Sequence, residues 1–259
     1  MHSKPILSLI GCGWLGRHLI SALTPYFTLQ ATTQSAQSAQ TLPIPTHIYD
    51  WRKDPLPTPL ISSHYTLIAI PPSAGGYCNY PQHTARLAKQ LRSLPANRLT
   101  FLISSTSAYP DDAGHYDENS APDPQSPIYQ AEQQLLNTLP NSLILRCGGL
   151  FGDNRLSGSK YYGQTSEITD KPLNLIHHQD IANAILALYQ HPPTLPQTYN
   201  LVHPEHPNRH HYYQAQAKLR QQPLPQFINK TKEPKRLIHA QKITQHTPFT
   251  YQHPPTQST

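Results

Sequence analysis

Apolar runs of strand length alternate with segments of helical periodicity over the first 146 residues of the chain. The run "LIAI" at 67–70 is apolar throughout, which is typical of a strand buried on both faces of a sheet. Over 14–23 the apolar residues recur three and four positions apart, on one face of a helix. Strands are predicted at 5–10, 27–33, 46–50, 65–70, 98–105 and 142–146, helices at 14–23, 83–94 and 129–139, and either a short helix or a loop at 34–40. The alternation predicts an α/β fold with a parallel sheet covered by helices on both faces.

The alternation is looser in the C-terminal part of the chain. Residues 149–171 read as a long loop, and Asp180 is placed to cap the N-terminus of the next helix. Further strands are predicted at 173–178 and 198–202, and further helices at 180–190 and 209–220. We therefore expect a main domain over residues 1–150 and a smaller C-terminal lobe over 151–259, with some strands of the lobe returning to the main sheet.

Gly11, Gly13 and Gly16 form the pattern G-x-G-x-x-G between the first predicted strand and the first predicted helix. In this context the first glycine permits a tight turn, the second lets the backbone approach a pyrophosphate, and the third lets helix and strand pack closely. The free N–H groups of the helix N-terminus then attract the phosphates. The pattern favours a dinucleotide-binding loop over a glycine-rich turn without a ligand.

The end of the second predicted strand bears on which dinucleotide is bound. NAD-binding proteins usually place an acidic residue there, about 20 residues after the glycines, to hold the ribose 2′-hydroxyl. This chain has Thr33 and Gln34 at that place, and its first acidic residue is Asp50. With Arg17 just after the last glycine, the sequence favours NADP over NAD.

Charge, cysteines and hydropathy narrow the class of protein. The net charge of +6 comes from scattered basic residues, which argues against a nucleic-acid partner and fits a phosphate-bearing small ligand. The three cysteines are far apart and lack metal-binding spacing, as in a reducing compartment. No segment has the ~18 apolar residues of a membrane span, and residues 1–23 do not read as a signal peptide. We expect a cytoplasmic protein without a membrane partner.

Several motifs occur in an order known from one large family. The segments are "GCGWLG", "FLISSTSAYPDDAG", "PQSPIYQAEQQLL", "ILRCGGLFGDNR", "LNLIHHQDIANAI" and "TYNLVHP". Over about residues 5–245 the chain resembles the extended and atypical short-chain dehydrogenase/reductases, in the branch of NAD-dependent epimerase/dehydratase or nucleoside-diphosphate-sugar epimerase-like proteins. The resemblance implies a Rossmann-like doubly wound parallel sheet and a C-terminal lobe over a small-molecule substrate such as a nucleotide sugar. It also implies a homodimer, since relatives often pair through helices like 82–94 and 129–139.

The resemblance also assigns site residues. Ser105 matches the serine or threonine that hydrogen-bonds the substrate, and Tyr129 is a second catalytic candidate. Substrate contacts are expected at Ser107, Arg146, Arg155 and His177, with pocket walls from residues 147–162. Cofactor contacts are expected at Gly11, Gly13, Trp14, Leu15, Gly16, Arg17, Thr33, Gln34, Asp50, Ile70, Pro71 and Pro72.

Two departures from the family bear on activity. Many extended members begin G-x-x-G-x-x-G, whereas this chain has the tighter pattern. More important, the family's proton transfer uses Tyr-x-x-x-Lys, and neither possible register supplies the lysine. Aligned on "AEQQLL", Pro124 and Ile128 take the two positions; with a small deletion they are Tyr129 and Gln133. The sequence therefore leaves open an NAD(P)-dependent oxidoreductase or epimerase/dehydratase-like enzyme and a non-catalytic NAD(P)-binding sensor or scaffold.

Two polar segments are candidates for other chemistry. The run "HPEHPNRHH" at 203–211 suggests metal binding, but two prolines interrupt it and a solvated loop and helix start is preferred. No metal site is expected. The acidic residues between 111 and 123 are expected in a mobile polar loop beside the cleft.

Overall fold

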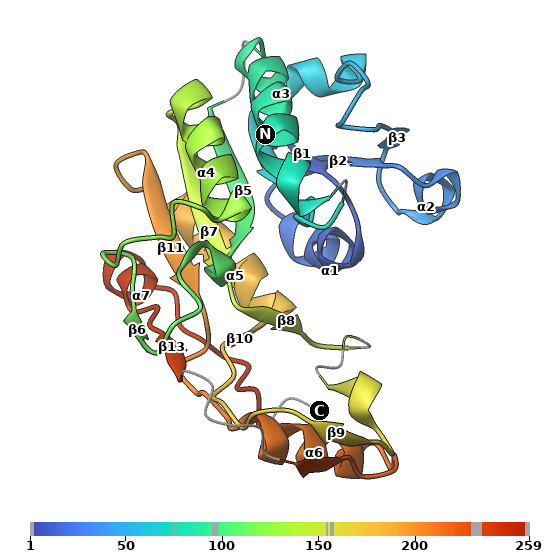
Figure 1. The fold of residues 1–259 in the computed structure, drawn as a ribbon. Helices are drawn as coiled ribbons and strands as arrows, with labels where there is room; N and C mark the ends of the chain where they lie inside the picture. Colours follow the sequence, from blue (N-terminus) through green and yellow to red (C-terminus); the bar gives the residue numbers. More distant parts are fainter. Residues whose placement is uncertain are drawn as a thin grey trace.

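Seven parallel strands form the central sheet of the computed structural model, which describes residues 3–74, 76–94, 98–153, 155, 158–228 and 235–256 (Figure 1). Across the sheet the order is β11 (Gln197–Leu201), β7 (Ser142–Cys147), β5 (Leu99–Ser105), β4 (Tyr65–Ile68), β1 (Ile6–Ile10), β2 (Thr28–Thr33) and β3 (Thr46–Ile48). The winding reverses between β1 and β4. In open α/β sheets, the crevice at such a switch point is where ligands bind.

Helices cover both faces of this sheet. On one face lie α1 (Trp14–Leu23) and α5 (His178–Gln190), and on the other α3 (Tyr80–Arg92) and α4 (Pro127–Thr138). Alternate residues of each strand serve the two layers: Leu9 of β1 packs with the α1 and α5 side, and its neighbour Ile10 with the α3 and α4 side. The doubly wound Rossmann-like sheet expected from the sequence is therefore confirmed.

Local signals set most helix ends. Helix α1 has the bounds that its apolar spacing predicts. Helix α4 begins two residues before the predicted helix because Ser126 caps it and Pro127 occupies its first turn, where no N–H is needed. The segment left open as helix or loop is helical, as α2 (Ala36–Thr41), and the Ser35 hydroxyl accepts the Ser38 N–H at 3.1 Å.

The predicted role of Asp180 as a helix cap is wrong. Helix α5 begins at His178, and the His177 ring accepts the Gln179 N–H at 3.2 Å. Asp180 lies in the first turn of the helix and is fully buried. Its carboxylate accepts the backbone N–H groups of Gln252 and His253, each at 3.2 Å. The residue therefore ties the C-terminal segment to the helix.

Short strand pairs build the rest of the C-terminal part. They are β8 (Gly149–Phe151) with β10 (Leu175–His177), β9 (Thr165–Glu167) with β12 (Gln226–Ile228), and β6 (Gly114–Tyr116) with β13 (Arg236–Ile238). The region 149–171, expected as a loop, thus contains β8 and β9, because each finds a partner far along the chain. Likewise the acidic segment contains β6, and Glu118 accepts the Asn200 N–H at 2.8 Å.

The remaining helices are α6 (Arg209–Leu219) and α7 (Lys242–His246). In Figure 1, α6 and β9 lie at the lower end of the molecule, away from α3 and α4. Strand β11 comes from the C-terminal part of the chain and joins the main sheet beside β7. The division of the chain at residue 150 stays a prediction. Within the described residues, no helix is long and apolar enough to cross a membrane.

Candidate functional site

The glycine loop between β1 and α1 gives each of its three glycines a different environment. Gly11 has a φ of +86°, and a Cβ there would lie 2.4 Å from Ile70 Cγ1. A Cβ on Gly16 would lie 3.1 Å from Cys12 Sγ, so this glycine lets α1 pack against the loop. A Cβ on Gly13 would meet no atom of the described chain within 4 Å. Gly13 is thus the one whose missing side chain leaves room for a ligand.

Hydrogen bonds hold the loop against the end of β2. The Gly11 N–H donates to Thr32 Oγ1 at 3.0 Å, and the Cys12 N–H donates to the Thr32 carbonyl at 2.7 Å. These bonds fix the loop, so the first turn of α1 presents its free N–H groups in a set direction. That arrangement suits an anion at the helix N-terminus.

A cavity of about 160 Å³ lies on the β2 side of the loop. Its lining is mostly apolar with a few polar groups: Gly11, Cys12, Gly13, Thr32, Thr33, Gln34, Tyr49, Trp51, Ile70, Pro71 and Ala74. Nine of the predicted cofactor residues line this or the next cavity, and they follow the ends of three different strands. An aromatic and aliphatic slot of this kind suits a flat heterocycle.

A second cavity, of about 330 Å³, lies on the β5 and β7 side of the loop. Its lining is Gly13, Trp14, Leu15, Ala69, Ile70, Pro71, Pro72, Ser73, Tyr77, Ile103, Ser104, Ser105, Cys147, Gly148, Gly149, Leu150 and Arg155. The two cavities share Gly13, Ile70 and Pro71. They lie next to each other over the carboxyl ends of β1, β2, β4, β5 and β7, and we call the two together the switch-point crevice.

A network of charged and polar side chains rims the smaller cavity. Gln34 Nε2 donates to Asp50 Oδ1 at 3.1 Å, and Arg52 forms an ion pair with Asp50 at 2.7 Å. The hydrogen bond from Arg52 lowers the pKa of Asp50 to about 2. Arg17 of α1 is not in the described lining of this cavity, and its Nη2 lies 3.5 Å from Thr41 Oγ1 of α2. Asp50 does not line the cavity itself but orients Gln34, which does.

The predicted substrate and catalytic residues separate into two groups. Ser105 and Arg155 line the larger cavity, and the Arg155 guanidinium lies 5.0 Å from the centre of the Trp14 ring. The Ser105 hydroxyl accepts the Ser107 N–H at 3.1 Å, which caps a short turn over 106–108. Ser107, Tyr129 and His177 are not part of the described cavity lining.

Arg146 lies in a buried ion pair. Its Nη2 is 2.6 Å from Glu132 Oε2, and its Nε donates to both carboxylate oxygens. The Ser104 hydroxyl donates a fourth hydrogen bond to Glu132, at 2.5 Å. Burial raises the pKa of Glu132, and the Arg146 guanidinium opposes this shift. Only 4 % of Arg146 is exposed, so its charge is directed at Glu132 and not at the crevice.

Sequence reasoning missed several residues of the larger cavity, Ala69, Tyr77 and Ile103 among them. Tyr77 is half exposed and begins a short turn before α3, a region with no periodic signal. Cys147 ends β7 and is the first residue of the pocket wall predicted over 147–162. Burial raises the pKa of the Cys147 thiol to about 12, so it stays protonated.

The histidine-rich segment 203–211 does not converge on one point. His203 Nδ1 accepts the Glu205 N–H at 3.0 Å, whereas His210 stacks on Phe227 and its Nε2 contacts the Ile168 carbonyl at 2.9 Å. His177 stacks on His253 with ring centres 4.4 Å apart, and burial is the main cause that lowers the pKa of His177 to about 4.

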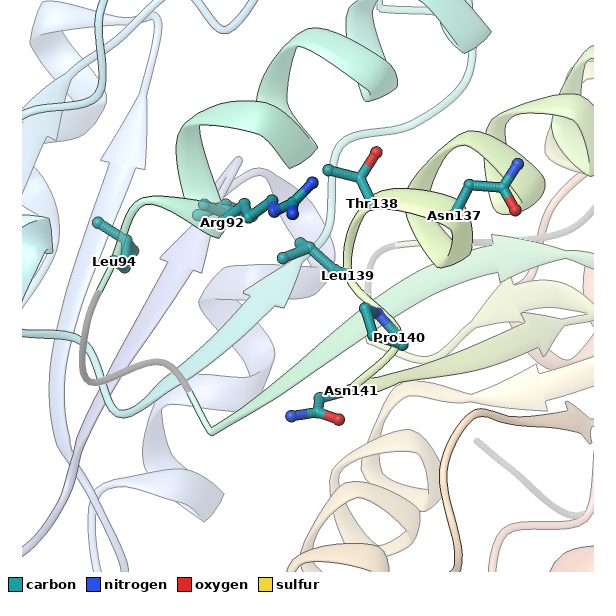
Figure 2. Close-up of a pocket in the computed structure, with 8 residues that line it drawn as sticks. Arg92, Leu94, Asn137, Thr138, Leu139, Pro140 and Asn141 are labelled. Atoms are coloured by element: carbon teal, nitrogen blue, oxygen red, sulfur yellow. The ribbon is translucent and has the colours of Figure 1, made fainter.

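A further hollow of about 380 Å³ lies at the opposite edge of the sheet (Figure 2). Its walls come from the ends of α3 and α4 and from the start of β7, with Arg92, Leu139 and Asn141 around it. It contains none of the predicted site residues. The amino ends of parallel strands are not where ligands of such sheets bind, so the switch-point crevice is the candidate site.

Comparisons with known proteins agree with this geometry. No family model matches the chain. Protein YeeZ of Escherichia coli K12 is 29% identical over 269 aligned positions, which cover 96% of each chain. The structure of UDP-glucuronic acid 4-epimerase from Bacillus cereus with UDP-glucuronic acid and NAD is similar at a TM-score of 0.81 and 14% identity, over 98% of this chain and 96% of that one.

A short-chain dehydrogenase/reductase superfamily protein from Agrobacterium tumefaciens, with bound NAD, gives a TM-score of 0.79 at 13% identity, over 98% of this chain and 94% of that one. At these identities the likeness concerns the fold. The chain has the fold of the epimerase-like short-chain dehydrogenase/reductases, as the sequence motifs indicate.

Proposed function

We propose that the protein binds a pyridine dinucleotide, NADP or NAD, along the switch-point crevice and acts as an NAD(P)-dependent oxidoreductase of the epimerase/dehydratase kind. One observation carries the proposal: two cavities share Gly13 in their linings, and at this loop position an added Cβ would meet no atom of the described chain within 4 Å. A diphosphate at this junction would rest on the amide end of α1. The two nucleoside halves would then occupy one cavity each.

The lining residues fit the two halves of such a cofactor. Tyr49, Trp51 and Thr33 would enclose the adenosine half, while Ser105, Leu150 and Arg155 would surround the nicotinamide half. The nicotinamide, when bound, supplies hydride exchange with a substrate carbon that carries oxygen. In this account Ser105 orients that oxygen through a hydrogen bond from its hydroxyl.

We favour NADP over NAD because no carboxylate lines the described part of the adenosine cavity. The side chain at the ribose end is Gln34, and its acidic partner, Asp50, is paired with Arg52 at 2.7 Å. A 2′-phosphate would meet the Arg17 guanidinium instead of a repelling charge. Charge-assisted hydrogen bonds between arginine and phosphate are among the strong ones in proteins.

The proposed substrate is a nucleotide sugar. Similar structures were determined with UDP-glucuronic acid or UDP-glucose and NAD, and the fold is shared over nearly the whole chain. In this chain Arg155 lies at the wall of the larger cavity and would face a diphosphate there. The predicted wall over 147–162 supplies Cys147 to Leu150 and Arg155; Asn154, Leu156 and Ser157 lie outside the described residues.

Few side chains in the described lining of the crevice could transfer a proton to or from a substrate. We propose that the usual tyrosine and lysine pair is missing. The two candidates for the lysine position are Ile128 and Gln133, which are not lysines, and neither is in the described lining of the larger cavity. The titratable groups in the described lining of the larger cavity are Tyr77, Cys147 and Arg155. Tyr77 is therefore the candidate proton donor for an enzyme. The same observation favours a second function, a non-catalytic NAD(P) sensor or scaffold.

Thermal unfolding with NADP, NAD and a UDP-sugar tests these proposals. Binding of either dinucleotide stabilises the native state and raises the unfolding temperature. No shift with either dinucleotide would contradict the proposed cofactor site. Turnover of a UDP-sugar that is lost in Ser105→Ala would establish the enzyme, and stable dinucleotide binding without turnover would favour the sensor.

We further propose a cytoplasmic homodimer that pairs through α3 and α4, which lie side by side on one face of the sheet. The three cysteines are unpaired, and Cys78 is exposed, which fits a reducing compartment. Light scattering during gel filtration tests the pairing. A mass of one chain at micromolar concentration would contradict it.

A further inference from the structure

His18, Asp153 and His178 converge beside the crevice from three separate segments. His18 belongs to α1, His178 begins α5, and Asp153 lies in the turn that follows β8. Asp153 Oδ2 is 2.9 Å from His18 Nε2 and 3.4 Å from His178 Nε2. All three donor atoms lie within 4.8 Å of one another.

The hydrogen bonding of His18 leaves its Nε2 as an electron-pair donor toward Asp153. Nδ1 lies 2.7 Å from the Trp14 carbonyl oxygen, which can only accept, so Nδ1 carries the proton. In the neutral ring, Nε2 then presents a lone pair to Asp153 Oδ2. Two lone pairs facing each other at this distance repel, so a positive centre is needed between them. A backbone carbonyl that fixes the tautomer in this way is typical of metal-binding histidines.

His178, which approaches the same carboxylate, also lacks a partner for its lone pair. It is buried, and within the described chain neither of its ring nitrogens makes a hydrogen bond. A proton on His18 would satisfy its contact with Asp153, but Nε2 of His178, 3.4 Å from the same carboxylate oxygen, would still make no hydrogen bond. A cation bound to all three atoms satisfies them together. Ligands of a tetrahedral zinc ion lie about 3.4 Å apart, close to the contacts seen here.

The backbone conformation of residues 152–153 brings Asp153 close to the two histidine rings. Gly152 has a φ of +122°, and a Cβ there would lie 2.4 Å from His178 Cδ2. Asp153 itself has a φ of +45°, and the Arg155 N–H closes the turn on the Gly152 carbonyl at 2.9 Å. Only a residue without a side chain lets the backbone pass this close to the histidine rings. The backbone therefore delivers the carboxylate to the two imidazoles.

From this convergence we propose that His18, Asp153 and His178 form a binding site for a divalent transition-metal ion, with Zn²⁺ as the best match. Two imidazole nitrogens and one carboxylate oxygen are the ligand types that zinc takes, and three protein ligands leave a position for water or a ligand oxygen. More than half of Asp153 is exposed, so that position opens to solvent. The site differs from the metal-free expectation drawn from the sequence, which weighed only the segment 203–211.

The metal site does not depend on the dinucleotide proposal. Its three ligands are outside the cavity linings, but Arg155 of the same turn is inside one. A bound ion would therefore hold the turn 152–155 to α1 and α5, at the wall of the crevice. Zinc binding and dinucleotide binding are measured separately, so either proposal can fail alone.

Zinc titration calorimetry on the full chain without a histidine tag tests the site, with Asp153→Asn and His18→Gln as ligand variants. His211→Gln is the matched control, because His211 is an exposed histidine on α6. We expect one Zn²⁺ per chain in the native protein and in the control, and an affinity about 100-fold lower in either ligand variant. Mg²⁺, which prefers oxygen ligands, should not bind.

A second measurement separates metal loss from misfolding. With EDTA present, Asp153→Asn should unfold at the same temperature as the native protein, because its side chain is largely exposed. Added Zn²⁺ should raise the unfolding temperature of the native protein but not of the variant. Zinc binding of equal strength in the native protein and in Asp153→Asn, or no zinc binding to the native protein, would overturn the proposal.

Discussion

The two ends of the switch-point crevice differ in what their polar groups face. At the glycine loop, the first turn of α1 and the backbone of Gly13 are open to the cavity, and Gln34 lines it. At the β5 and β7 end, Glu132 and Arg146 form a buried ion pair with each other, and neither is in the described lining of the cavity. At one end, therefore, groups suited to an anion are open to the cavity, whereas at the other end the charged side chains are occupied with each other.

The largest expected effect comes from breaking the buried ion pair. Glu132→Gln leaves the Arg146 guanidinium buried without its counter-charge, which typically costs about 3–5 kcal/mol. We expect the free energy of unfolding to fall by this amount in urea denaturation. The double variant Glu132→Leu with Arg146→Met should recover most of the loss, since apolar replacement of a whole buried pair is often neutral.

If the ion pair of Glu132 and Arg146 only stabilises the fold and does not bind the cofactor, the double variant should still bind the dinucleotide. A loss below about 1 kcal/mol in Glu132→Gln would contradict the reading of this pair as a stabilising one, since that is the range of exposed ion pairs.

The next effect is on the rigid part of the glycine loop. Gly11→Ala forces a side chain into a left-handed backbone and places its Cβ 2.4 Å from Ile70 Cγ1. Strain and overpacking of this kind each cost about 1–3 kcal/mol. Denaturant unfolding should show the loss without any cofactor present. An unchanged midpoint would mean that the loop takes another conformation in solution.

A smaller effect sharpens the cofactor preference. Arg17→Gln removes the guanidinium that would meet a 2′-phosphate, and we expect NADP affinity to fall about tenfold, or 1.4 kcal/mol. NAD affinity should change little, because NAD lacks that phosphate. Parallel titrations of native protein and variant measure both. Equal loss for the two dinucleotides would place Arg17 away from the 2′ position.

The smallest effect concerns the cysteines. Burial raises the pKa of Cys12, within the glycine loop, to about 11, and that of Cys147 to about 12. A raised pKa keeps the thiol protonated and unreactive at pH 8, since the thiolate is the nucleophile. Maleimide should therefore label one thiol per chain, the exposed Cys78. Labelling of Cys12 in the native state would show that the loop opens.

The parts of the fold that depend on local signals were predictable. Helix α1 has its predicted bounds because the glycines before it and the apolar spacing within it are both short-range features. The three-residue strands β6, β8 and β9 were not, because each is defined by a partner strand far along the chain. Asp180 resembled a helix cap, but its actual partners, Gln252 and His253, lie 72 and 73 residues away.

The candidate site divides in the same way. The glycine pattern predicted the loop that carries Gly13, and the family resemblance pointed to Ser105, which lines the larger cavity. Other features of the site arise from packing between elements far apart in the sequence. They are the ion pair of Arg146 with Glu132, the position of Tyr77 in the lining of the larger cavity, and the contact of His18 with His178. No spacing in the sequence encodes these contacts, so only the structure reveals them.

The most direct test compares dinucleotide binding by the native protein and by Gly13→Ala in calorimetry. No atom of the described chain would touch the added methyl group, so the unfolding free energy should stay within about 1 kcal/mol of the native value. A bound diphosphate would meet the methyl, and we expect affinity to fall at least about a hundredfold. Tight binding by the native protein with loss in the variant is the predicted result. No binding by the native protein, or equal binding by both, would contradict the account.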